Sequence, residues 1–105
     1  MVRLVVSPET QADLDEILRW LTREAGRPVA LRYAEKFRAA FRHLTEFPET
    51  GARRPKLARD MRIWLVTPYV IFYRFAAEDQ TVRVVRILHG RRDMTERLFG
   101  PQVTS

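Results

Sequence analysis

Cysteine is absent from the 105-residue chain, and histidine occurs only twice, at His43 and His89. The absence of cysteine excludes disulfide bonds, thiol catalysis and cysteine-ligated zinc. The two histidines share no metal-ligand spacing, so we expect neither a metal site nor a bound cofactor. Long apolar runs are also missing, since no segment approaches the roughly 18 residues of a membrane span, and the N-terminus MVRLVVSPET lacks the layout of a signal peptide. We therefore expect a cytoplasmic protein with no membrane partner.

Lysine is scarce, although the chain is strongly basic. The formal net charge is +6, the pI is about 10.7, and only two of the 19 basic residues are lysines, Lys36 and Lys56. Residues 1–52 carry eight basic and eight acidic side chains, whereas residues 53–105 carry eleven basic and five acidic ones, so the whole excess lies in the second half. This asymmetry favours an anionic partner, either nucleic acid or an acidic protein segment. A solvated basic surface is the alternative interpretation.

The first half of the chain predicts a strand followed by two helices. Residues 2–6 form a short apolar run of β-branched character, which is typical of a strand. Residues 7–9, with the sequence SPE, provide a helix N-cap, a first-turn proline and a first-turn acid, and Gly26 ends this helix. A second helix is expected over residues 28–47, because the apolar spacing is helical and Pro48 stops it. The two helices should fold back on each other as a hairpin.

The second half predicts a loop and three strands. Residues 48–60 contain two prolines, a glycine and four basic residues, which indicates a basic loop. Residues 61–66, 69–76 and 81–89 are short runs rich in Val, Ile and aromatic residues, as in an antiparallel meander. A short C-terminal helical tail is expected over residues 91–99. The order β-α-α-β-β-β predicts an α+β fold, in which a helical hairpin packs on one face of a mainly antiparallel sheet.

We expect this fold to form a single domain over residues 1–105, because a chain of this length has room for one core.

Arginines inside the predicted strands are the first candidate site. Strict alternation places Arg86 on one strand face with Val82, Val84 and Leu88, and if that face coincides with the face of Arg74, the two guanidiniums would form one anion-binding cluster. The alternative interpretation is that these arginines lie on the solvent-exposed face of the sheet, where polar side chains alternate with buried ones, and bind no ligand.

The segment after the last strand, HGRRD at residues 89–93, is the second candidate site. His89 is suited to general acid–base catalysis near neutral pH, and the arginines to binding a phosphate. The alternative interpretation is that His89 has only a structural role at the end of the strand.

Two apolar side chains outside the buried helix stripes are the third candidate site. Trp20 lies beside the stripe of the first helix, and Leu31 points away from the stripe of the second. Exposed apolar side chains of this size indicate a surface for a protein partner, although Trp20 could equally flank the core.

Several motifs, in this order, resemble the RelE/ParE superfamily of small toxins from bacterial type II toxin–antitoxin pairs. The chain has LVVSPE at residues 4–9 and TPYVIFY at residues 67–73. At the end of the second helix it has FP at residues 47–48, with Gly51 three residues later. The most specific motif, VRILHGRRD at residues 85–93, resembles the ParE branch. Together the motifs span nearly the whole chain.

The resemblance implies one of two mechanisms. RelE-like members are ribosome-dependent mRNA endonucleases, whereas ParE-like members bind and poison DNA gyrase without hydrolysis. RelE-like nucleases commonly have an arginine where this chain has Val70 and often a tyrosine near the position of Leu98, and only Arg92 matches their pattern. The resemblance therefore favours a non-enzymatic gyrase inhibitor. The alternative is a RelE-type endonuclease with His89 and Arg92 as catalytic residues.

The resemblance also implies a partner, a cognate ParD-like antitoxin that forms a hetero-oligomer with the toxin. The toxin is then expected to bind a specific DNA sequence only through the antitoxin. We expect the antitoxin tail to lie against the helical hairpin and an open sheet edge, with Trp20 and Leu31 as contacts. Arg86, Arg91 and Arg92 are the predicted contacts to DNA gyrase. A third hypothesis, outside the toxin class, is a small basic nucleic-acid-binding domain.

Overall fold

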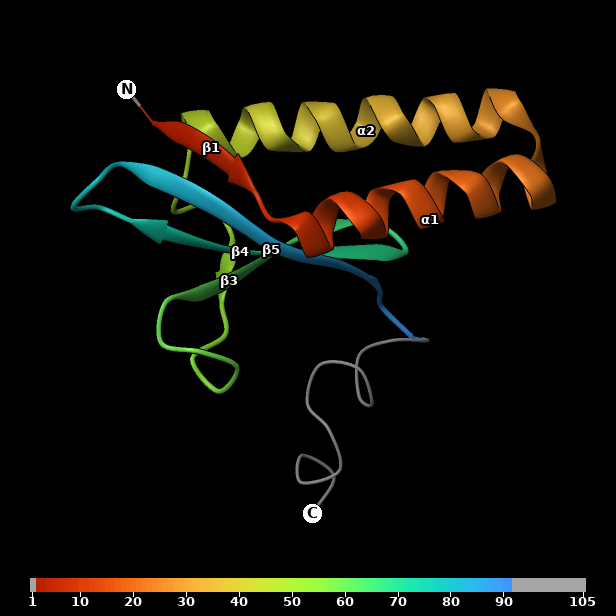
Figure 1. Ribbon diagram of the computed structural model, residues 1–105. Helices are drawn as coiled ribbons and strands as arrows, with labels where there is room; N and C mark the ends of the chain where they lie inside the picture. The colour runs from red at the N-terminus through yellow and green to blue at the C-terminus, as the bar shows by residue number, and fades with distance from the viewer. Residues whose placement is uncertain (1, 92–105) are drawn as a thin grey trace, which may run out of the picture.

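The computed structural model describes residues 2–91, in which two helices lie against one face of a five-stranded sheet (Figure 1). The elements in chain order are β1 (Arg3–Val6), α1 (Pro8–Ala25), α2 (Arg27–Glu46), β2 (Ala52–Arg53), β3 (Met61–Val66), β4 (Tyr69–Ala76) and β5 (Thr81–His89). The predicted α+β class, the helical hairpin and the strands of the meander are confirmed. The predicted helical tail lies almost entirely outside the described residues.

The helical hairpin begins and turns where local chemistry requires it. The Oγ of Ser7 accepts a hydrogen bond from the backbone N–H of Thr10 at 3.0 Å and caps α1, as the sequence predicted. Gly26 ends α1 with a φ of +95°, a conformation that favours glycine, and its N–H donates to the carbonyls of Leu21 and Thr22. The second helix starts at Arg27, one residue before the proline, and runs back along α1 (Figure 1).

The sheet has the order β1-β5-β4-β3-β2, with β1 parallel to β5 and all other neighbours antiparallel. A parallel pair needs a long connection, and the chain between β1 and β5 contains the helical hairpin and strands β2, β3 and β4. Strand β2 lies inside the segment that the sequence predicted as a loop. It consists of two residues, Ala52 and Arg53, opposite Ile63 and Arg62 of β3, and is too short to show a period in the sequence.

The main core lies between the hairpin and the sheet. Phe37 and Leu44 of α2 pack against the helix-facing side chains of the sheet, among them Ile71, Tyr73 and Val84, which are fully buried. The opposite face of the sheet carries a smaller apolar cluster built on Met61, Val70, Phe72 and Leu88, against which Leu57 and Ala58 of the β2–β3 loop pack.

A bulge in β5 overturns one prediction from the sequence. Tyr73 pairs with Val84 but Phe72 pairs with Arg86, so that Val85 is an extra residue in β5. Because the bulge shifts the alternation by one, Val82 and Val84 face the helices whereas Leu88 faces the other way. Arg86 lies opposite Phe72 and Leu88 opposite Val70, so these two residues of β5 share a face as predicted. The prediction that Arg86 also shares this face with Val82 and Val84 was wrong.

The hydroxyl of the buried Tyr73 on β4 is hydrogen-bonded to the segment between α2 and β2. The hydroxyl of Tyr73 donates to the carbonyl of Pro48 at 2.9 Å and accepts from the N–H of Gly51 at 2.8 Å. A Cβ atom at Gly51 would lie 2.5 Å from this hydroxyl and 2.6 Å from the carbonyl oxygen of Ile63, so glycine is required here. Burial raises the pKa of Tyr73, which keeps the phenol protonated and able to donate.

We predict that Tyr73→Phe destabilises the protein by about 1–3 kcal/mol, because the substitution leaves two backbone groups without their partner while the ring stays in place. Urea unfolding measures this free energy. The matched control is Tyr33→Phe, since the Tyr33 hydroxyl makes only an exposed 3.4 Å contact with the carbonyl of Thr67. Equal losses for the two variants would contradict the assignment.

Candidate functional site

The N-terminus of α1 is bonded to the bulge of β5. Strand β1 ends at Val6, opposite Val84, so the edge of β5 beyond this point has no strand beside it. Residues at the start of α1 supply the missing partners. The N–H of Ser7 and the hydroxyl of Thr10 both donate to the carbonyl of Val84 at 3.1 Å, and the hydroxyl of Ser7 donates to the carbonyl of Val85 at 3.0 Å.

Asp13 extends this connection by one more turn of α1. Its carboxylate accepts two hydrogen bonds from the guanidinium of Arg86, at 2.8 and 2.9 Å, and a third from the N–H of Ile87 at 2.9 Å. The forked geometry is the one that a guanidinium and a carboxylate make best. Both side chains are mostly buried, with 22% of Arg86 and 13% of Asp13 exposed.

This ion pair changes the interpretation of the strand arginines. Arg74 lies 3.8 Å from the carboxylate of Asp60, which precedes β3, whereas Arg86 binds Asp13 on α1. The two guanidiniums are thus bound by different carboxylates and do not form the shared anion cluster expected from strict alternation. The charge of Arg86, one of the predicted gyrase contacts, is neutralised by Asp13, and the ion pair holds α1 on β5.

The end of β5 carries the second predicted site. Gly90 donates its N–H to the carbonyl of Pro68 at 2.8 Å, which holds the strand end against the β3–β4 turn. The ring of His89 meets the ring of Tyr69 edge to face, and its Nδ1 accepts a hydrogen bond from the N–H of Arg91 at 3.2 Å. The side chain of Arg91 is exposed, and Arg92 lies outside the described residues.

The predicted antitoxin contacts lie on the surface of the helical hairpin. Trp20 on α1 is 43% exposed and Leu31 on α2 is 58% exposed, so both side chains are available to a partner. The sequence analysis did not single out Leu4 and Val5 on β1, which are also exposed. Because strands of a parallel pair are commonly buried on both faces, the apolar run of β1 carried no signal for exposure.

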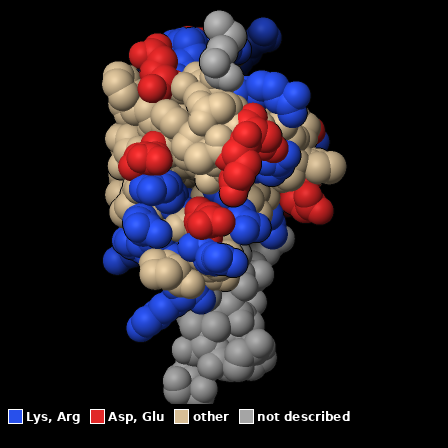
Figure 2. Space-filling view, turned by 90° about the vertical axis from the view of Figure 1, so that its left-hand side faces the viewer, with Lys and Arg blue, Asp and Glu red and all other residues tan. Residues whose placement is uncertain are grey.

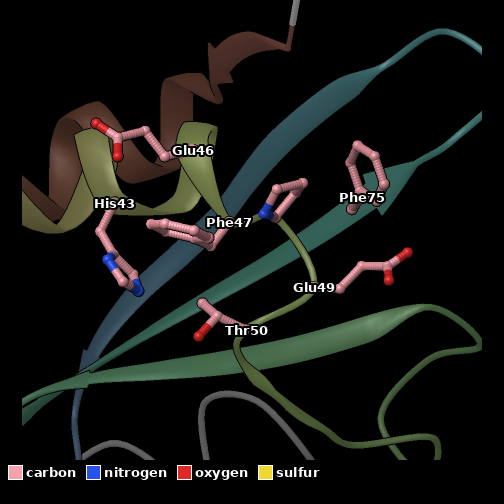
Figure 3. A pocket seen from close by; sticks show the side chains of 7 residues that line it. His43, Glu46, Phe47, Glu49, Thr50 and Phe75 are labelled. Atoms are coloured by element: carbon pink, nitrogen blue, oxygen red, sulfur yellow. The ribbon is translucent and has the colours of Figure 1, made fainter.

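A hollow at the end of α2 was also missed (Figure 3). It has a volume of about 620 Å³ and is lined by His43, Glu46, Phe47, Pro48, Glu49, Thr50 and Phe75. His43 stacks on Trp64 with ring centroids 4.7 Å apart. The ring of Phe47, which is more than half exposed, is tilted against His43 with centroids 5.2 Å apart. Aromatic walls beside two carboxylates suit an apolar group that carries a positive charge. Six of the seven lining residues belong to the continuous segment 43–50, and Phe75 of β4 completes the hollow.

The described residues hold no group of three or more His, Cys, Asp or Glu side chains placed to bind a metal ion. Neither described helix is long and apolar enough to cross a membrane.

A family model for the ParE toxin of the type II toxin-antitoxin system, parDE, matches residues 4–94. The chain belongs to the ParE toxin family. Toxin ParE3 of Caulobacter vibrioides is 31% identical over 98 residues, which cover 93% of this chain and 96% of that protein. The predicted membership of the RelE/ParE superfamily, in its ParE branch, is confirmed, and the protein is a toxin of a type II toxin–antitoxin system.

Solved structures share the fold of this ParE-family toxin. A chain of the chromosomal ParDE system from P. aeruginosa superposes with a TM-score of 0.71 at 23% identity, covering 85% of this chain and 96% of that chain. A chain of the toxin-antitoxin complex RelBE2 from Mycobacterium tuberculosis has a TM-score of 0.56 at 19% identity, covering 84% of this chain and 96% of that chain. At these identities the likeness shows the fold alone.

We predict that Asp13 and Arg86 of this ParE-family toxin are energetically coupled. A double-mutant cycle with Asp13→Ala, Arg86→Ala and the double variant should give a coupling of about 1.5–3 kcal/mol, as for hydrogen bonds to charged groups. The control cycle uses Glu35 and Arg38, an ion pair one turn apart on α2 that is more than half exposed, and should give a several-fold smaller coupling. Chemical unfolding measures both. Equal coupling in the two cycles would show that the Asp13–Arg86 pair does not hold α1 on the sheet.

Proposed function

We propose that this ParE-family toxin acts by binding DNA gyrase, without catalysis of its own, and that a cognate antitoxin neutralises it. The observation that carries the proposal is the environment of Val70 on β4. RelE-like nucleases commonly have an arginine at this position, but Val70 is only 6% exposed and packs with Met61, Phe72 and Leu88. A cation in this apolar cluster would lose its hydration without gaining a partner.

The groups near the end of β5 support binding over hydrolysis. Cleavage of RNA through the 2′-hydroxyl needs a base, an acid and a group that stabilises charge on the phosphate. His89 uses Nδ1 to accept from the backbone of Arg91, and Asp13 already neutralises Arg86. A rigid strand end that presents a basic surface needs none of these chemical steps. We propose that Arg91 and Arg92 contact gyrase and that Arg86 positions the strand end that carries them.

The antitoxin is proposed to cover the helical hairpin and the edge of the sheet. Both solved structures named above come from toxin–antitoxin systems, which supports a partner of this kind. Trp20 and Leu31 offer apolar anchors on the hairpin, and β1 is the edge strand on one side of the sheet, with exposed Leu4 and Val5. An extended segment can add to such an edge through backbone hydrogen bonds. We place this hetero-oligomer in the cytoplasm, where gyrase acts.

We predict that the purified protein blocks supercoiling of relaxed plasmid by gyrase and ATP, and that linear DNA accumulates when detergent is added before the gel. Arg91→Ala/Arg92→Ala should need roughly tenfold more protein for the same effect, which corresponds to about 1.4 kcal/mol of lost binding. The matched control is Arg19→Ala/Arg23→Ala, which removes two exposed arginines from α1 and should leave inhibition unchanged.

Unchanged supercoiling with protein that halts cell growth would overturn the gyrase proposal. A ribosome-dependent endonuclease would then be the function, and His89→Ala would abolish killing in a protein that still folds. If Arg91→Ala/Arg92→Ala inhibits gyrase as strongly as the unchanged protein, gyrase stays the proposed target, but Arg91 and Arg92 are not its contacts.

We predict that Trp20→Ala and Leu31→Ala each weaken binding of the cognate antitoxin by roughly tenfold or more, because truncation of an apolar anchor removes a large share of the binding energy. Calorimetric titration measures the affinity. Leu65→Ala is the control, since Leu65 is 59% exposed on β3, away from the hairpin. Equal losses for all three variants, or none for the first two, would contradict the assignment.

A further inference from the structure

Half of the net positive charge of the chain lies in one short segment. Residues 53–60, which we call the basic loop, begin at the last residue of β2 and end just before β3. The loop contains four basic residues, Arg53, Arg54, Lys56 and Arg59, and one acid, Asp60, so it carries a net charge of +3 in a chain of net charge +6. Figure 2 shows the side of the molecule on which this loop lies, with Lys and Arg side chains gathered over its lower half.

The four basic side chains of the loop have no carboxylate partner among residues 2–91. The ion pairs of the described structure join Arg38 to Glu35, Arg74 to Asp60, Arg83 to Asp79 and Arg86 to Asp13. Asp60 therefore interacts with Arg74 of β4, and all four loop cations are exposed. The arrangement contrasts with that of Arg86, whose charge is used within the fold.

The loop is anchored at both ends and in the middle. The N–H of Arg54 donates to the carbonyl of Met61 at 2.8 Å, and the N–H of Leu57 donates to the carbonyl of Arg54 at 3.0 Å. Leu57 and Ala58 pack against the apolar cluster on the sheet face opposite the helices. Because these interactions order the backbone in advance, a partner that binds the cations bears a smaller entropic cost.

The chemistry of the loop fits phosphates better than a protein surface. Protein interfaces are centred on apolar or aromatic anchors, and arginine is common in them, whereas lysine and the acidic residues are depleted. Here Leu57 and Ala58 are turned toward the sheet and the exposed surface is made mainly of three guanidiniums and one ammonium. Phosphate oxygens of a nucleic acid are bound by such groups without an apolar anchor and without recognition of sequence.

We propose that the basic loop binds the phosphate backbone of duplex DNA without reading its sequence. The proposal deepens the proposed function, since a toxin bound to gyrase acts beside the DNA that this enzyme holds. The loop then binds the DNA itself, separately from the protein contact at the end of β5. Its test uses DNA without gyrase, so that the two proposals can fail independently.

The experiment measures fluorescence anisotropy of a labelled DNA duplex of mixed sequence with the full-length protein, over about 50–200 mM salt. The loop variant is Arg53→Gln/Arg54→Gln/Lys56→Gln/Arg59→Gln. Removal of each phosphate-binding cation should reduce the slope of log affinity against log salt by about 0.9, so we expect a total reduction of about 3–4 and an affinity at least roughly tenfold lower. Circular dichroism melting confirms that the variant is folded.

The matched control removes the same charge elsewhere. Arg19→Gln/Arg23→Gln/Arg27→Gln/Arg32→Gln neutralises four exposed arginines of the helical hairpin and should keep the slope and affinity close to those of the unchanged protein. Equal losses in the two variants would show that net charge, and not the loop, binds DNA, and would overturn the proposal. Failure of the unchanged protein to bind the duplex, or stronger binding of an RNA duplex of the same sequence, would overturn it as well.

The supercoiling assay separates this proposal from the gyrase proposal. A loop variant that has lost DNA binding but still inhibits gyrase would confirm the loop as the DNA-binding segment and leave the protein contact intact. Loop-dependent DNA binding by a protein that does not inhibit gyrase would support the role of the loop and overturn the gyrase proposal alone.

Discussion

The contact between the N-terminus of α1 and the bulge of β5 holds the two layers of this protein together. Parallel pairing of β1 with β5 stops at Val84, which leaves backbone groups of β5 that need partners in a buried setting. Ser7, Thr10 and Asp13 provide those partners, and Asp13 also binds Arg86. The contact fixes the hairpin on the sheet and fixes the direction in which β5 leaves the core toward His89 and Arg91.

Arginines serve two different purposes in this fold. Arg86 is bound by Asp13, and Arg62 donates to the carbonyls of Glu49 and Gly51, so both are used to join segments of the chain. The cations of the basic loop have no carboxylate partner in the described part of the chain, and the side chain of Arg91 is exposed. These exposed cations lie at the sheet, whereas the exposed Trp20 and Leu31 lie on the helices. In the proposed function, this separation gives the antitoxin one surface and the target another.

The sequence predicted the helices and the main strands because each is long enough to show its own period and is bounded by residues with strong local preferences. Ser7 and Gly26 fixed the ends of α1 through capping chemistry that acts within a few residues. Strand β2 and the hollow around Phe47 escaped prediction for the opposite reason. A two-residue strand has no period, and the hollow forms only where Phe75 of β4 lies against the segment of residues 43–50.

For this protein, the sequence by itself determined the α+β class, the hairpin, the meander and the ParE family, because all of these depend on local periodicity and on motifs in a given order. The tertiary structure alone decided what the charged side chains do. The bulge at Val85 turned Arg86 out of the expected alternation and onto Asp13, 73 residues earlier in the chain. No local pattern encodes that pairing, because an ion pair depends on which side chains the fold brings within a few ångströms of each other, and this distance is set only when helix and sheet pack.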